Sequence, residues 1–219
     1  SKKITLIKFF NVTPSGYMDP DHPVPWFPAW GVKFPEPVSD VFSTVSIINE
    51  FRPNNRWMLL ASEAAASEIH LWTGWYALRK NEISGEMVAK TADAEFLRLI
   101  SGTRQINKAF ERAGIAVGDE SAWIVMLPDS DLGEGFGEFS IPVDTYNDST
   151  EDGIRLIEHL GGSLITERPI PSIEGLRRIG CEYGVGSERV VNRGLRVYGG
   201  TGNVFHSGGL LSPFQDSLL

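Results

Sequence analysis

Proline is concentrated in one stretch near the start of the chain. Residues 14–37, PSGYMDPDHPVPWFPAWGVKFPEP, hold seven of the thirteen prolines. Because proline fixes φ and cannot donate a backbone hydrogen bond, we expect neither a helix nor a central strand there. The stretch also contains Tyr17, Trp26, Phe27 and Trp30. It is therefore predicted to be a long ordered loop that lies on the core, with a partner-binding loop as the alternative.

The rest of the chain divides into segments of strand or helix length, separated by glycines, prolines and helix-capping residues. Strands are predicted over residues 4–12, 56–60, 122–127 and 163–168. Helices are predicted over residues 63–81, 92–100, 104–113, 151–160 and from Ser172 to about Cys181, and residues 40–51 fit either state. The pattern predicts an α/β class, with one compact domain over residues 1–183 and a small mixed β-sheet flanked by helices. A glycine-rich C-terminal extension follows over residues 184–219.

Helical spacing also predicts which side chains face the core. In the helix over residues 63–81, capped by Ser62, the inward set is Ala65, Ile69, Trp72 and Tyr76. In the helix over 104–113 the inward set is Ile106, Ala109, Phe110 and Ala113. Gly102 separates this helix from the one before it, which predicts a tight corner between the two.

Composition and charge limit the classes of function. The formal net charge of −8 argues against a protein that coats long nucleic acid, although it leaves room for one local basic patch. No apolar run is long enough to span a bilayer, and the N-terminus lacks the apolar core of a signal peptide. The single cysteine, Cys181, cannot form an internal disulfide. We therefore expect a cytoplasmic protein without a membrane partner.

Motifs for catalysis or cofactor binding are missing from the sequence. His22, His70, His159 and His206 lack metal-ligand spacing, and no Gly-x-Ser-x-Gly elbow or phosphate-binding glycine motif occurs. Asp129 and Asp131 begin a segment that does not fit a calcium loop, because Glu134 stands where glycine is needed. The sequence thus predicts no metal, no cofactor and no enzyme, and leaves an enzyme that uses the glycine-rich region Gly199–Gly209 as a remote alternative.

The stretch SGTRQINKAF, residues 101–110, combines a helix start with polar side chains of types that can bind nucleic acid. Arg104 and Gln105 lie in the first turn of the predicted helix, where backbone N–H groups have no partner within the helix. Arg104, Lys108 and Arg112 share one face at helical spacing. A phosphate or a base edge fits such a place, because arginine binds phosphate and an amide both donates and accepts. The alternative is an ordinary charged helix face.

The segment EFLRLISGTRQINKAFERAGI, residues 95–115, resembles the signature of a known family. This family is the small regulatory subunit of the KEOPS (EKC) complex, also called the PRPK-binding protein family, in its archaeal type. Residues 68–82, EIHLWTGWYALRKNE, are similar to the helix that precedes the signature, and the strand over 122–127 follows it as in the family. The resemblance covers about residues 45–180.

The resemblance implies a compact α/β fold without catalytic activity of its own. Members bind and stimulate the small kinase-like ATPase of the complex, and they help to recruit tRNA through its single-stranded 3′ CCA end. The complex adds threonylcarbamoyl to an adenosine of tRNA, so the implied role is tRNA processing. Combined with the residue pattern, the tRNA-binding candidates are Arg104 and Gln105, with Lys108 as a flanking phosphate contact and Arg98 and Arg112 as weaker candidates.

Two parts of the chain depart from the family. The C-terminal SERVVNRGLRVYGG replaces the helix that meets the kinase in the family, so the kinase contact at that end is in doubt. The proline-rich residues 14–37 have no counterpart. Both departures leave open a second hypothesis, that of a protein-interaction module without RNA binding that uses the aromatic loop or the C-terminal region.

Overall fold

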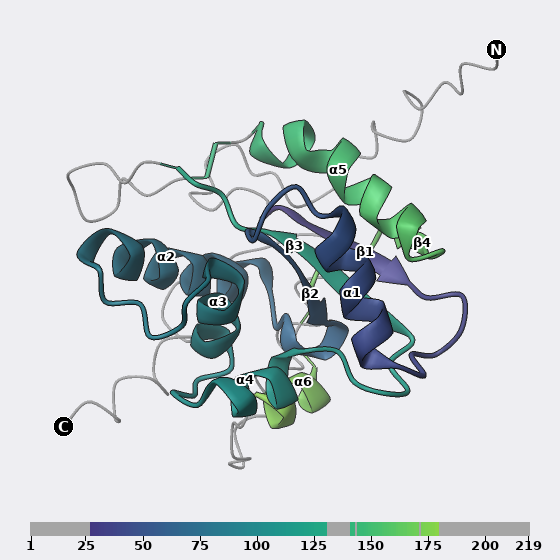
Figure 1. Cartoon of the computed structure of the whole chain (residues 1–219), viewed down its shortest axis with the longest axis horizontal. Helices are drawn as coiled ribbons and strands as arrows, with labels where there is room; N and C mark the ends of the chain where they lie inside the picture. Colours follow the sequence, from purple (N-terminus) through teal and green to yellow (C-terminus); the bar gives the residue numbers. More distant parts are fainter. Residues whose placement is uncertain (1–26, 131–140, 143, 171, 180–219) are drawn as a thin grey trace, which may run out of the picture.

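The sheet is built around a strand that lies inside the proline-rich stretch. The computed structural model of the chain describes residues 27–130, 141–142, 144–170 and 172–179 (Figure 1). Its strands are β1 (Ala29–Lys33), β2 (Trp57–Ala61), β3 (Ser121–Met126) and β4 (Ser163–Ile165), paired in the order β2-β3-β1-β4. β1 is therefore a central strand, and the expectation that residues 14–37 contain none is wrong. Pro28 and Pro35 flank β1, so its own five residues keep their backbone donors.

The α/β class is confirmed, and all three strand pairings of the described sheet are antiparallel. Trp30 of β1 and Leu59 of β2 both lie opposite Ile124 of β3, while β4 pairs along the other side of β1. The sequence predicted a mixed sheet. Strand direction was not readable from the apolar runs, because buried parallel and antiparallel strands accept the same residues.

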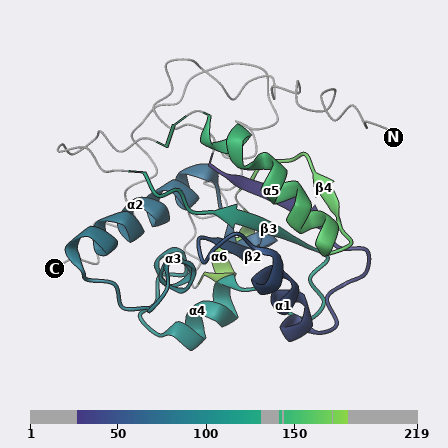
Figure 2. The same ribbon diagram turned by 45° about the horizontal axis from the view of Figure 1, so that its top comes forward.

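Helices cover both faces of the sheet (Figures 1 and 2). They are α1 (Val41–Phe51), α2 (Glu68–Ser84), α3 (Ala92–Ile100), α4 (Ile106–Ala113), α5 (Thr145–His159) and α6 (Ile173–Arg178), with a short 3-10 turn, η2 (Ser62–Ala64). In both views α2, α3 and α4 are grouped on one side and α1 and α5 on the other. Residues 40–51, which fitted either state, are thus helical, and Asp40 caps them by accepting a hydrogen bond from the N–H of Phe42.

Alternate residues of the strands bury their side chains in two separate cores. Towards α1 and α5, the core contains Trp30, Leu59, Ile124, Ile48 and Leu156. Towards α2 and α3, it contains Met58, Leu60, Val125, Trp75 and Phe96. Because successive side chains of a strand point to opposite faces, a strand covered on both sides is apolar throughout. This explains the unbroken apolar runs that predicted β2 and β3 correctly.

The first part of the helix predicted over 63–81 is arranged differently from the expectation. Ser62 begins the 3-10 turn η2, and α2 starts at Glu68 with Ser67 as its cap. The core-facing residues of α2 are Leu71, Trp75 and Leu78, all fully buried, and Ile69 is 41% exposed. Trp72 and Tyr76 do pack against this core, although only partly buried. The chain before Ser67 is not part of α2, so the helical spacing counted from Ala65 does not apply to it. The buried face of α2 is therefore centred on Leu71, Trp75 and Leu78.

Two further predicted segments change length. The helix predicted over 151–160 begins earlier, at Thr145, so Thr150 lies within α5, where its Oγ1 accepts from the indole N–H of Trp30. Ser172 caps α6 as predicted, by accepting from the N–H of Gly175, but the helix ends at Arg178 and not near Cys181. The predicted strand 4–12, most of the proline-rich stretch and the extension 184–219 lie outside the described residues.

Candidate nucleic-acid interface

α3 and α4 meet at a tight corner, as the sequence predicted. Gly102 has a φ of +62°, a region that favours glycine, and the N–H of Thr103 donates to the carbonyl of Arg98 at 3.3 Å. Arg104 and Gln105 follow at once, and α4 begins at Ile106. The corner therefore places these two polar residues at the N-terminal end of α4.

The start of α4 leaves backbone donors without acceptors. Gln105 is the N-cap residue; its carbonyl accepts from the N–H of Ala109 at 2.9 Å, but its side chain does not cap the helix. Among the described residues, no acceptor faces the N–H groups of Ile106, Asn107 and Lys108. These donors carry the positive end of the helix dipole.

Three of the five candidate side chains are exposed at this end of α4. They belong to Arg104, Gln105 and Lys108. Within the described part of the chain, none of the three makes a hydrogen bond or an ion pair through its side chain. Two cations and an amide are thus presented together with unpaired N–H groups, and such a set can bind a phosphate or a base edge.

Arg112 belongs to the interior of the corner. Its Nη1 donates to the carbonyl of Ser101 at 3.0 Å and to that of Ile179 at 3.4 Å. Arg178 in turn donates through Nε to the carbonyl of Arg112 and through Nη2 to that of Gly114. Arg112 therefore ties α4 to the ends of α3 and α6, and the structure does not group it with Arg104 and Lys108 on the exposed surface.

Arg98 is held by a buried carboxylate. Its Nε and Nη2 donate to the two oxygens of Glu95 at 3.0 and 2.5 Å. Glu95 is fully buried and also accepts from the N–H of Ala89 and from the amide of Asn81. Burial by itself raises the pKa of Glu95, but the hydrogen bonds from Arg98, Ala89 and Asn81 outweigh it and lower the pKa to about 2. Arg98 thus neutralises a buried charge.

The facing of α4 differs from the prediction. Ala109 and Ala113 are fully buried as expected, but Phe110 is 49% exposed. The buried face of α4 is turned towards Arg112, because the two small alanines let the helix approach its neighbours closely and Arg112 finds carbonyl acceptors on that side. Arg104 and Lys108 are exposed as predicted, although Phe110 is not buried.

His70 supports the corner from beneath. Its Nε2 lies 3.2 Å from the carbonyl of Ile100, and the N–H of Ala66 donates to its Nδ1. Burial lowers the pKa of His70, which favours the neutral ring. These contacts give His70 a structural role at the corner.

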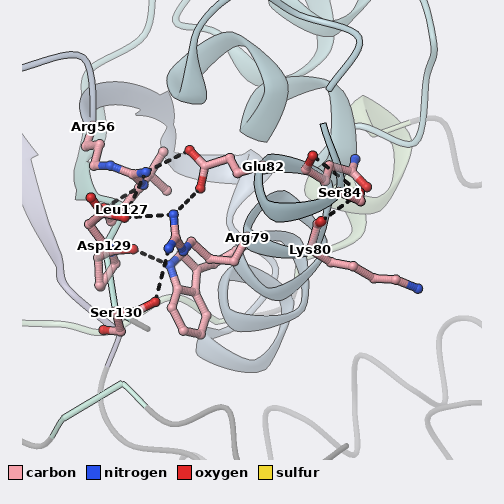
Figure 3. A network of polar contacts seen from close by, with 11 residues as sticks. Arg56, Arg79, Lys80, Glu82, Ser84, Leu127, Asp129 and Ser130 are labelled. Carbon is pink, nitrogen blue, oxygen red and sulfur yellow. Dashed lines mark hydrogen bonds and ion pairs between the residues drawn. The ribbon is translucent and has the colours of Figure 1, made fainter. Parts of the chain in front are cut away.

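An ion-pair network joins α2 to the chain that follows β3 (Figure 3). Arg56 and Arg79 both contact Glu82, at 2.7 and 2.5 Å, and both contact Asp129. Two cations and two carboxylates balance, so the network holds the chain after β3 against α2 and offers no excess charge to a ligand. The spacing of Arg79 and Glu82 on one helix was the only local signal.

A second ion pair without a local signal in the sequence joins Glu68 to Arg168, a hundred residues later. Arg168 pairs with Glu68 and donates to the carbonyls of Phe27 and Ala29, while the N–H of Phe27 donates to Glu68. Both side chains are largely buried. This pair fixes the chain at the start of β1, which indicates a structural role.

The described residues contain neither a membrane-spanning helix nor a metal-ligating cluster. No helix in the ranges that the structure describes has the length and apolar character needed to cross a membrane. In the same ranges, histidine, cysteine and carboxylate side chains form no group of three or more that could hold a metal ion. The region Gly199–Gly209 lies outside these ranges.

Comparison with known proteins gives no family for the chain. No protein-family model matches it, and no curated protein sequence matches it significantly.

Proposed function

We propose that the chain is a non-catalytic accessory subunit of a KEOPS-type complex, located in the cytoplasm. In this role it binds the 3′ CCA end of tRNA and a small kinase-like ATPase, and it supports the threonylcarbamoyladenosine modification of tRNA. The observation that carries the proposal is the exposed set of Arg104, Gln105 and Lys108 beside the unpaired N–H groups of α4. The resemblance of residues 95–115 to the family supplies the ligand.

The chemistry of this set suits a single-stranded end of RNA. Proteins recognise unpaired RNA through its exposed base edges and backbone, and duplex RNA mostly through its shape. Arg104 and Lys108 can neutralise phosphates, and the amide of Gln105 can pair with a base edge. With a net charge of −8, the protein as a whole repels RNA, so the contact is confined to a small area.

The alternative, a protein-interaction module without RNA, loses part of its predicted surface. Three of the five aromatic residues of the proline-rich stretch, Phe27, Trp30 and Phe34, are buried in the two cores. These side chains stabilise the fold and are not available to a partner. The other two, Tyr17 and Trp26, lie outside the described residues.

A binding assay with two forms of one tRNA tests the proposal. The full chain is titrated with mature tRNA and with the same tRNA shortened by its CCA end. We expect clearly tighter binding of the mature form. Equal affinity for the two forms, or no binding of either, would reject the RNA role and favour the interaction module, whose partners a pull-down from the source cell would identify.

A further inference from the structure

Phe110 is an exposed aromatic ring on the helix that carries the candidate site. Two other phenylalanines on the same side of the sheet, Phe27 and Phe96, are fully buried, whereas Phe110 is 49% exposed. An exposed phenyl ring gives up the stabilisation that burial would provide. On α4 it lies among polar residues, since its nearest exposed neighbour along the helix surface is Asn107, one turn earlier.

The exposed face of α4 can be traced around the helix. At 100° per residue, its exposed side chains follow one another in the order Phe110, Asn107, Glu111 and Lys108. The face runs from the aromatic ring of Phe110 on one flank to the cation of Lys108 on the other, about 160° around the helix. Arg104 and Gln105 lie at its N-terminal end.

This arrangement matches the way in which proteins bind single-stranded nucleic acid. Such sites combine cations that follow the backbone with aromatic rings on which bases stack. We propose that Phe110 is the stacking platform for an unpaired base at the 3′ end of the RNA, whose phosphates Arg104 and Lys108 contact. Asn107, next to the ring, offers a donor and an acceptor to the edge of the stacked base. The inference rests on the proposed RNA-binding function and adds the residue that holds a base.

Glu111 provides an independent test of the same path. It is the only acidic residue of α4 and lies on the exposed face between Asn107 and Lys108. An RNA strand that crosses this face brings phosphates close to the Glu111 carboxylate, and the two repel each other. Removing the charge should therefore strengthen binding, whereas a strand that passes elsewhere would be affected little.

Three variants of the full chain, titrated with mature and CCA-shortened tRNA, test the platform. Phe110→Leu keeps an apolar side chain but removes the aromatic face, and we expect its affinity for mature tRNA to fall at least about fivefold, the lower end of the effect of one stacking contact. Its affinity for the shortened tRNA should hardly change. Glu111→Gln should bind mature tRNA more tightly than wild type. Phe42→Leu is the matched control, because Phe42 is 81% exposed on α1, which has no lysine or arginine.

The outcomes distinguish a failure of the proposed RNA-binding function from a failure of the stacking platform alone. If wild type does not prefer mature tRNA, the proposed function itself fails. If wild type prefers it, and Phe110→Leu melts and binds like wild type, only the stacking platform is wrong. If Phe42→Leu loses as much affinity as Phe110→Leu, the effect is not specific to α4 and the platform is also rejected. Loss of a protein partner from Phe110→Leu at unchanged RNA affinity would assign the ring to a protein contact and overturn the inference.

Discussion

Arg112 and Arg178 each donate a hydrogen bond across the junction of α4 and α6. The Nη1 of Arg112 reaches the carbonyl of Ile179 at 3.4 Å, and the Nε of Arg178 reaches the carbonyl of Arg112 at 3.0 Å. Arg112 also contacts the carbonyl of Ser101 at the end of α3. The two arginines therefore join the ends of three helices, and they hold α4 in the orientation that exposes Arg104 and Lys108.

Arg178→Ala should destabilise the protein by about 1.5–3 kcal/mol, because carbonyls at the end of α4 lose a charged donor. Urea unfolding measures the change. Arg178→Lys should restore only part of the loss, since an ammonium group cannot reproduce the planar fork of the guanidinium. Arg155→Ala is the control, because Arg155 is half exposed and pairs with Asp152 at the surface. An equal loss of stability in both alanine variants would contradict a stabilising role of Arg178 at the junction of α4 and α6.

Phe110→Ala should cost at most about 1–2 kcal/mol, because half of the ring is already in water. Phe96→Ala should cost about 3–5 kcal/mol, since Phe96 is fully buried and its removal leaves a cavity. Thermal or urea unfolding of the two variants gives the comparison. A large loss for Phe110→Ala would show that the ring is buried in solution, and it would also reject the stacking platform.

Arg104→Ala should leave the fold intact and weaken the binding of mature tRNA by about 1–3 kcal/mol, the usual range for a good arginine contact. Gln105→Ala should weaken it less and reduce the preference for the CCA end. Affinity should fall with salt only shallowly, because few phosphates are neutralised. The titrations use Arg155→Ala as a matched control for the loss of an exposed arginine. If Arg104→Ala binds mature tRNA as tightly as wild type does, the RNA site is not at this corner.

Glu95 should make stability depend on acid pH. Its pKa falls from the ordinary 4.5 to about 2, since its hydrogen bonds, led by Arg98, outweigh burial. A carboxylate with a lowered pKa stabilises the fold fully above its unfolded pKa, and the stabilisation is lost as pH falls towards the folded pKa. Wild type should thus be more stable than Glu95→Gln at pH 7, and the difference should shrink from about pH 4.5 to about pH 2.

Unfolding curves of wild type and Glu95→Gln over this pH range test the prediction. Glu50→Gln, a change at an exposed position on α1, serves as the control and should unfold at pH 7 like wild type. A difference between wild type and Glu95→Gln that stays constant with pH would mean that Glu95 is not a paired, ionised group in the folded protein.

Local patterns were sufficient for elements whose determinants lie within a few residues. The apolar runs at 56–60 and 122–127 predicted β2 and β3, and Gly102 predicted the corner that follows α3. The exposed positions of Arg104 and Gln105 also followed from the sequence, since polar residues at a helix start remain in water unless a partner covers them.

What the tertiary structure decided were the contacts between residues far apart in the chain. β1 became a central strand because β3 and β4 pair with its two sides, although prolines flank it. Arg98 and Arg112 face inward because Glu95 and the carbonyls of Ser101 and Ile179 accept from them. Phe110 is exposed because α4 is turned to satisfy Arg112 while two alanines pack closely. The helical period predicts the approximate direction of the apolar face of a helix. Which side chains at the border of that face are buried depends on the residues that pack against the helix in the fold.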